Sequence, residues 1–303
     1  MNELKRVTKG WVRVVLIIVP FFIFVGVSQI LAMMILGIKL SERNLVPNTF
    51  QMTVLTLSML LGTVSVVAMF REWVDKESFR SLGFKLKNAL NESLIGILMG
   101  ILMISAGFFL LLFLHEIDWV GTEPDLSSFL LSIILFAAVA LNEELIFRGY
   151  ILSNLMLSMN RYVALVVTSI LFSLVHLGND SFSWISFLTI ILAGLLLGLP
   201  YIYTKSLWLP IALHFSWNFF QGTIFGFSVS GNKEYSLITQ SRPADTLLNG
   251  GNFGFEGSIL SALFLSMAIV ALWIYYFRKE RVAPIPLAEE VVLREELDRL
   301  VEE

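Results

Sequence analysis

The sequence contains no cysteine among its 303 residues and is poor in charge. The absence of cysteine excludes disulfide bonds, thiolate metal sites, iron–sulfur clusters and a cysteine nucleophile. Only 15% of the residues are charged, whereas about 25% is usual for a soluble domain. The 21 Lys and Arg against 24 Asp and Glu give a net charge of -3, so no basic excess indicates a nucleic-acid partner.

Apolar residues are in excess, at 56% of the chain with a mean hydropathy of +0.79. One helical crossing of a hydrocarbon core of about 30 Å needs roughly 20 mostly apolar residues. We therefore expect an all-α, polytopic membrane bundle of about eight transmembrane helices. The predicted spans are Val14–Ile38, Leu45–Phe70, Ser93–Leu114, four that begin near Ser127, Tyr162, Trp184 and Ser206, and Ser258–Phe277.

The distribution of Lys and Arg predicts the orientation, because cytoplasmic loops carry the positive excess. With eight crossings both termini share one face, and 16 Lys and Arg residues fall on that face against four on the other. We expect both termini to be cytoplasmic and the protein to lie in the cell (plasma) membrane. The first apolar run exceeds the roughly 7–15 residues of a signal-peptide core, which indicates a retained helix.

The chain divides into a membrane domain at 1–282, with a motif core at about 127–226, and an acidic amphipathic cytoplasmic tail at 283–303. Residues 71–92 mix basic and aromatic side chains, which is typical of an interfacial segment. The long outer loop 227–257 is expected to be a lid or a disordered stretch.

Two smaller features of the predicted spans have structural interpretations. Gly194 and Gly198 form a GxxxG pattern in the sixth span, which predicts a close helix-packing face. Glu256 precedes the eighth span and is explained as a negative charge at a helix amino end.

Three predicted spans lead into or contain ionisable side chains, which are costly in a membrane and by default indicate function. Glu143, Glu144 and Arg148 follow the fourth span, His176 lies in the fifth and His214 in the seventh. If the fourth helix continues to a tight turn before the fifth, Glu143 and His176 lie at one level, roughly 25 Å from that turn. We therefore expect one catalytic core in helices 4, 5 and 7, buried in the membrane and open towards its cytoplasmic half.

The spacing within the first motif separates the roles of its two carboxylates. Glu144 and Arg148 are four residues apart and can pair on one helix face. Glu143 is about 100° around the helix from Glu144 and can point into a different space. One carboxylate is thus neutralised by the arginine, while the other is free to act as a base that desolvation strengthens.

The other two motifs supply complementary groups. Phe172 and His176 are four residues apart, as are His214 and Asn218. A histidine beside a desolvated glutamate can help to deprotonate water, and a second histidine with an amide can donate hydrogen bonds to an oxyanion. The phenyl ring is placed to wall the site. This set of residues favours a water-activating acyl hydrolase, with peptide hydrolysis as its natural reaction.

The sequence resembles the CPBP (CAAX protease and bacteriocin-processing, Abi) family at three motifs. That family groups type II CAAX prenyl endopeptidases with bacteriocin-processing and self-immunity proteins and lysostaphin-resistance-like proteins. The motifs, in this order, are Glu143-Glu144-x-x-x-Arg148, Phe172-x-x-x-His176 and His214-x-x-x-Asn218.

The resemblance implies an all-helical intramembrane bundle and glutamate-dependent endoproteolysis without an obligatory metal or other cofactor. It implies that Glu143 activates water with His176, and that His214 and Asn218 form the oxyanion hole. The implied partners are the lipid bilayer and a membrane-associated protein or peptide substrate, with no nucleic acid and an oligomeric state left open. The implied supporting residues are Glu144, Arg148 and Phe172.

Two alternatives remain open at the level of sequence. One Glu and two His form a legitimate catalytic zinc set, although the sequence has no HExxH and three helices must then supply the ligands. Intramembrane carboxylates and histidines also serve in proton relays, so a non-proteolytic peptide immunity or transport protein is the second alternative.

Overall fold

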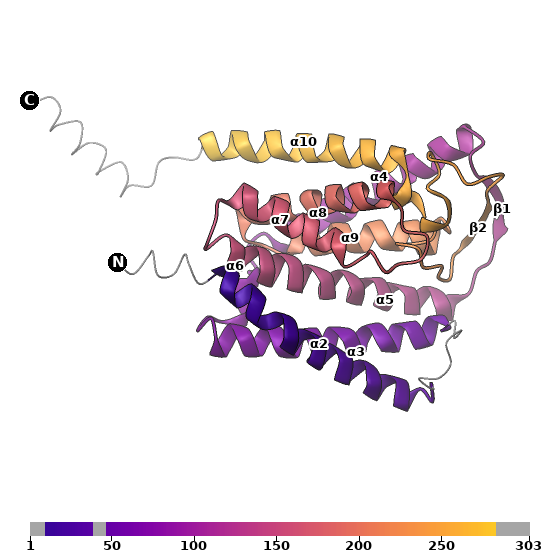
Figure 1. Cartoon of the computed structure of the whole chain (residues 1–303). Coiled ribbons are helices and arrows are strands. Elements are labelled where there is room, and N and C mark those ends of the chain that lie inside the picture. Colours follow the sequence, from indigo (N-terminus) through magenta and orange to yellow (C-terminus); the bar gives the residue numbers. More distant parts are fainter. Residues whose placement is uncertain (1–9, 39–46, 283–303) are drawn as a thin grey trace, which may run out of the picture.

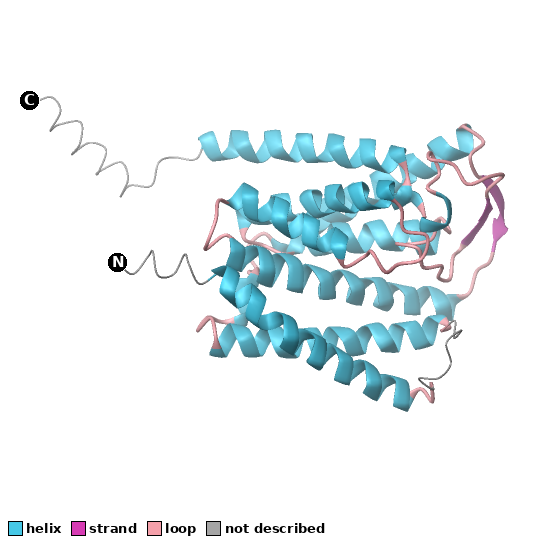
Figure 2. Cartoon of the chain, viewed as in Figure 1, coloured by secondary structure: helices cyan, strands magenta, loops and turns pink. Residues whose placement is uncertain are grey.

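The computed structural model describes residues 10–38 and 47–282, and the predicted acidic tail lies outside the described residues. Helices dominate the chain and pack side by side in a bundle, which confirms the all-α membrane architecture (Figure 1; Figure 2). The α-helices of twelve residues or more are α2 (Gly10–Ile35), α3 (Thr49–Trp73), α4 (Ala89–Phe113), α5 (Leu126–Glu144), α7 (Arg161–Leu174), α8 (Trp184–Thr204), α9 (Trp208–Phe219) and α10 (Ile259–Val282).

Six helices in the described part of the chain are long and apolar enough to cross a membrane. They are α2, α3, α4, α5 with its continuation, α8 and α10. The helix α2 begins, and α10 ends, at the same end of the bundle (Figure 1). This arrangement is the one that an even number of crossings predicts.

The fourth predicted helix continues beyond α5, as expected, but its hydrogen-bonding pattern changes. After Glu144 the chain forms a π-helix, η2 (Leu145–Leu152), and then a short turn of α-helix, α6 (Ser153–Leu155). The side chain of Asn160 then caps α7 by accepting a hydrogen bond from the amide of Tyr162 at 2.9 Å. Departures of this kind from the α-helix are frequent at functional sites.

The fifth and seventh predicted crossings are shorter than the others. Helix α7 has 14 residues, which is about 21 Å at 1.5 Å per residue. Helix α9 has 12 residues and is extended by a second π-helix, η3 (Phe220–Ile224). Since α7 ends at Leu174, His176 lies in the turn that follows this helix rather than within it.

The GxxxG pattern packs α8 against α7 within the chain. A Cβ atom on Gly194 would lie 2.8 Å from Cβ of Ser169, and a Cβ atom on Gly198 would meet the side chain of Leu165. Both partners belong to α7. The predicted packing face is therefore confirmed, and its partner is the helix that precedes α8.

A small antiparallel sheet at one end of the bundle was not expected from the sequence. Strand β1 (Asp118–Thr122) lies between α4 and α5 and pairs with β2 (Ile238–Ser241) in the long loop. The amide of Glu123 extends the pairing by donating to the carbonyl of Leu237 at 2.8 Å. The sheet thus ties the loop to the connection between two membrane helices (Figure 2).

The long loop 227–257 is ordered and packed against the bundle. It contains two 3₁₀ turns, η4 (Gly251–Phe253) and η5 (Phe255–Gly257), whose Phe253 and Phe255 are almost completely buried. A Cβ atom on Gly107 of α4 would meet the ring of Phe255, so α4 and the loop approach closely there. Of the two expectations for this loop, a disordered stretch is wrong.

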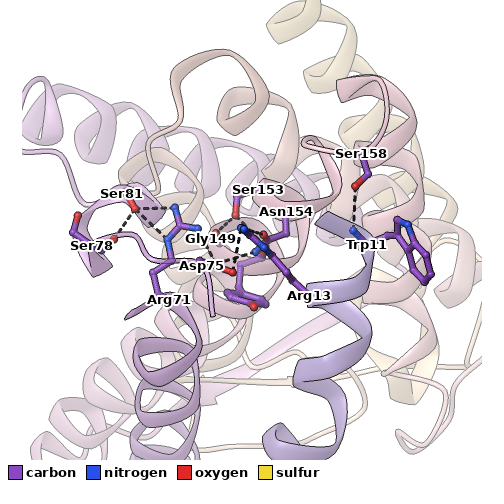
Figure 3. Close-up of polar contacts among 11 residues, drawn as sticks. Trp11, Arg13, Arg71, Asp75, Ser78, Ser81, Gly149, Ser153, Asn154 and Ser158 are labelled. Carbon is purple, nitrogen blue, oxygen red and sulfur yellow. Dashed lines mark hydrogen bonds and ion pairs between the residues drawn. The ribbon is translucent and has the colours of Figure 1, made fainter. Parts of the chain in front are cut away.

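The opposite end of the bundle holds a buried ionic cluster, shown in Figure 3. Asp75 pairs with Arg13 at 3.2 Å and with Arg71 at 2.9 Å. Asn154 donates to the same carboxylate at 3.4 Å, and Arg71 also donates to Ser81 at 2.7 Å. The predicted interfacial stretch 71–92 therefore begins with two buried charges, and its interior is turns and a 3₁₀ helix, η1 (Phe79–Leu82).

Candidate active site

A cavity of about 300 Å³ lies between the helices and the long loop. All four residues predicted to act in catalysis line it, together with the predicted wall residue Phe172. The structure thus brings together side chains that are up to 75 residues apart in the chain. The ionisable and amide side chains of the lining are Glu143, His176, Asn179, His214, Asn218, Asn232, Glu234 and Glu256.

The cavity occupies the half of the bundle nearer β1 and β2. Helix α3 lines it with Met52 and Thr56, close to its first residue, and α10 contributes Leu265 from its first two turns. Ser230 of the loop completes this side. Both described chain ends lie at the other end of the bundle (Figure 1). The two predictions, cytoplasmic termini and a site open to the cytoplasmic half, therefore cannot both hold.

A buried chain of three ionisable groups forms the wall behind the cavity. Oε1 of Glu144 lies 2.7 Å from Nη1 of Arg148 and 2.8 Å from Nδ1 of His214. The second Arg148 amino group donates to the carbonyl of Gly194 at 3.3 Å. The spacing of Glu144 and Arg148 predicted their pairing, but not the contact between Glu144 and a histidine 70 residues later.

Phe172 has a larger part than the walling role that its spacing indicates. The guanidinium of Arg148 lies over the Phe172 ring, 4.4 Å from its centroid. The same ring lies edge-on to the imidazoles of His176 and His214, at centroid distances of 4.9 and 6.3 Å. A cation above an aromatic face is stabilised by the ring quadrupole. Phe172 therefore joins the three motifs in one packed unit.

Glu143 is the carboxylate that the supporting arginine leaves free. Its Oε2 lies 3.8 Å from Nε2 of His214, and its side chain is 21% exposed, towards the cavity. It accepts no hydrogen bond from the described part of the chain. Glu144, in contrast, is fully buried and contacts the guanidinium of Arg148 and the imidazole of His214. The structure thus separates the two neighbouring carboxylates as the helical geometry predicts.

The hydrogen bonds of the two imidazoles fix which nitrogen faces the cavity. Nδ1 of His176 lies 2.7 Å from the carbonyl oxygen of Phe172, which can only accept, so Nδ1 carries the proton. Nδ1 of His214 likewise donates to the Glu144 carboxylate at 2.8 Å. In each neutral ring Nε2 is left with a lone pair.

Asn218 is buried, at 4% exposure, and lines the cavity from α9. Its side-chain amide has no hydrogen-bond partner among the described residues. Buried amides are usually satisfied by protein or water. An amide N–H held against a cavity is therefore available to a bound group.

The loop adds two carboxylates that the sequence analysis did not assign to the site, Glu234 and Glu256. Oε2 of Glu256 accepts hydrogen bonds from the amide and the hydroxyl of Ser230, both at 2.8 Å. Asn179, in the turn after α7, donates to the carbonyl of Ser230 at 2.9 Å. The interpretation of Glu256 as a helix-end charge misses its place in the cavity, and the signal available was a lone charge between Phe255 and Gly257.

Within residues 10–38 and 47–282, no group of three or more His, Asp or Glu side chains is arranged to hold a metal ion. The zinc alternative needs Glu143, His176 and His214 as ligands, and these three side chains are not arranged as a metal-binding group in this structure.

Comparison with known proteins gives one match. Residues 125–220 match the family model described as type II CAAX prenyl endopeptidase Rce1-like. No curated protein and no solved structure matches the chain. The matched segment contains all three motifs and ends just after Asn218.

The match agrees with the resemblance carried by those motifs, and it supports a membrane endopeptidase of the CAAX protease type. It runs from the residue before α5 to the start of η3, so it covers the helices that supply Glu143, Phe172, His214 and Asn218. Residues 125–220 of the chain are therefore similar to the Rce1-like family of type II CAAX prenyl endopeptidases.

Proposed function

We propose that the protein is an intramembrane endopeptidase that hydrolyses a peptide bond of a membrane-associated protein or peptide by glutamate-activated water. The observation that carries the proposal is that Glu143, His176, His214 and Asn218 line one cavity, with the Glu144–Arg148 pair fixed behind them. The cavity also has apolar walls, such as Leu135 and Leu197, which suit a substrate drawn from the bilayer.

Glu143 is the proposed general base. Its carboxylate faces the cavity without a hydrogen-bond donor from the described chain, so a water molecule can donate one hydrogen bond to it. The same water can donate a second hydrogen bond to Nε2 of His176, whose Nδ1 proton is fixed by the Phe172 carbonyl. Deprotonation by Glu143 then yields the hydroxide that attacks the peptide carbonyl, and the proton passes to the leaving amine.

Asn218 and His214 are the proposed donors to the oxyanion. The amide of Asn218 does not titrate and can donate a hydrogen bond at any pH. His214, in contrast, donates from Nε2 only as the imidazolium, because the proton of the neutral ring lies on Nδ1 and is donated to Glu144. An imidazolium there lies beside two carboxylates and one guanidinium, so the four charges cancel. Preorganised donors of this kind typically contribute about 10²–10³ in rate each.

The proposal is tested by the new protein termini that the protein generates in membranes. Cells that produce the wild type are compared with cells that produce Glu143→Gln, which removes the base but keeps the shape. The matched control is Glu72→Gln, an exposed glutamate at the far end of α3. We expect termini that appear with the wild type and the control only.

The same termini from Glu143→Gln membranes would contradict the base assignment. If the wild type generates no termini beyond those of cells without the protein, a non-proteolytic role replaces the proposal. Loss of activity with a chelator, together with stoichiometric zinc in the purified protein, would favour the zinc-dependent alternative.

We further propose that both termini are cytoplasmic in the plasma membrane, so the cavity and the loop 227–257 lie in the outer half. The absence of native cysteine allows a direct test with single cysteines at exposed positions. An impermeant maleimide on intact cells is expected to label Asn252→Cys in the loop but not Lys87→Cys at the opposite end. The reverse labelling pattern would overturn this orientation.

A further inference from the structure

The lining of the cavity is rich in carboxylates and contains neither lysine nor arginine. Three carboxylates face it, those of Glu143, Glu234 and Glu256, and neither Lys nor Arg is among the lining residues. Arg148, the nearest guanidinium in the site, is 1% exposed and is engaged by Glu144 and by the Gly194 carbonyl. The carboxylates of the lining therefore have no arginine or lysine to balance them.

The imidazole of His176 adds a further acceptor. Nδ1 of His176 donates to a backbone carbonyl and Nδ1 of His214 donates to Glu144. The neutral His176 ring thus presents the lone pair of Nε2 to the cavity. Three carboxylates and this lone pair around one cavity favour a ligand that is rich in donors.

The two loop carboxylates are held in place by the protein. Ser230 fixes one oxygen of Glu256 through its amide and hydroxyl, and Phe255 anchors the preceding residue in the core. Burial raises the pKa of Glu256, while its hydrogen bonds from the hydroxyl and the amide of Ser230 act in the opposite direction. Burial also raises the pKa of Glu234, to about 7. Both carboxylates are therefore partly shielded from water.

Asn218, the proposed oxyanion donor, is a second observation that points to a ligand in this cavity. Its side chain is more than nine-tenths buried, lines the cavity and has no hydrogen-bond partner in the described part of the chain. A buried amide without partners is uncommon in native proteins. A bound peptide can satisfy it with a carbonyl oxygen, which places the peptide backbone beside the carboxylates.

We infer that the cavity selects a peptide substrate with a lysine or arginine side chain next to the scissile bond, held by Glu256 and Glu234. The inference rests on the proposed peptidase function. A cation donates to carboxylates through charge-assisted hydrogen bonds, which are roughly twice as strong as neutral ones. Glu143 remains the base, and the two loop residues determine specificity.

The test uses purified protein in phosphatidylcholine liposomes and a peptide library made by digestion of a proteome at acidic residues. Cleavage sites are those that appear with the wild type and not with Glu143→Gln. We expect Lys or Arg beside the cleaved bond at about tenfold or more above its frequency in the library. A tenfold preference corresponds to about 1.4 kcal/mol, which one partly desolvated charge pair can supply. Acetylation of the library lysines should remove the lysine sites and keep the arginine sites.

The outcomes separate the two proposals. Glu143-dependent cleavage without enrichment of Lys or Arg overturns the inference and leaves the peptidase function standing. No Glu143-dependent cleavage overturns the peptidase function, and the inference with it. Cleavage at lysine sites that survives acetylation also overturns the inference.

Variants then assign the selectivity to residues. Glu256→Gln and Glu234→Gln are expected to lower the enrichment towards the library frequency. The matched control, Asp118→Asn, changes an exposed carboxylate of β1 outside the cavity and should leave the enrichment unchanged. Unchanged enrichment in both Glu→Gln variants overturns their assignment.

Discussion

Two buried ionic clusters lie in different halves of this bundle, and their differences separate a structural role from the proposed catalytic one. At one end, Asp75 is paired through both oxygens, with Arg13 and Arg71, and none of these residues lines the cavity (Figure 3). In the other half, Glu144 is paired behind the cavity while Glu143 faces it without a donor. A buried carboxylate that is ion-paired to two arginines away from the cavity holds helices together, whereas one that faces the cavity without a donor is available for chemistry.

The comparison predicts that the largest loss of stability comes from the Asp75 cluster. Asp75→Asn keeps the shape and removes the charge that two buried arginines share. We expect a loss of about 3–5 kcal/mol, because removal of one partner leaves the others buried without compensation. Thermal unfolding of the detergent-purified protein measures it. Asp245→Asn, which breaks an exposed pair with Arg242, is the control and should cost about 0–1 kcal/mol.

In the catalytic half, Asn218→Ala should reduce activity rather than stability. The amide makes no hydrogen bond to the described chain, so its loss leaves no partner unsatisfied. We expect kcat for a cleaved peptide to fall by about 10²–10³ with little change in KM or Tm. The buried Asn249, which caps two backbone amides, is the matched control. Asn249→Ala should lower Tm and spare the rate of the folded protein. Equal changes in kcat and Tm for Asn218→Ala and Asn249→Ala would show that the two asparagines do not differ in role.

The smallest expected effect concerns Glu234, whose ionised form is disfavoured by burial. The pKa of Glu234 is raised to about 7 from 4.5, so its protonated form favours folding and that contribution is lost as the pH rises through about 7. Glu234→Gln should therefore raise Tm at pH 8 by about 2–4 °C, the shift produced by about 1 kcal/mol, and by less at pH 6. The other ionisable groups of the cavity are Glu143, Glu256, His176 and His214. An equal Tm gain at both pH values would show that ionisation of Glu234 does not destabilise the folded protein.

Much of the candidate site follows from local spacing. Residues four apart on a helix share a face, and this rule alone predicts that Glu144 pairs with Arg148 and that Glu143 points elsewhere. Apolar runs predict the helices, because a membrane crossing needs about 20 apolar residues. The depth match of Glu143 and His176 also agrees with the structure, since both line one cavity.

The parts that the sequence does not predict depend on contacts between distant segments. The contact of Glu144 with His214 depends on how α9 packs against α5, which no helical period encodes. The pairing of β1 with β2 joins strands of five and four residues that lie more than a hundred residues apart. Glu256 reaches the cavity because Phe255 and the loop glycines fold the loop inward, and the sequence around it shows only a charge before a helix.

The most direct test of the account compares Glu143→Gln with Asp75→Asn in one liposome preparation, with cleavage rate per folded protein and Tm measured together. We expect Glu143→Gln to lower the rate by about 10²–10⁴ and to leave Tm unchanged. We expect Asp75→Asn to lower Tm and to leave the rate per folded protein unchanged. Cleavage by Glu143→Gln at the wild-type rate would contradict the central claim that this carboxylate activates water.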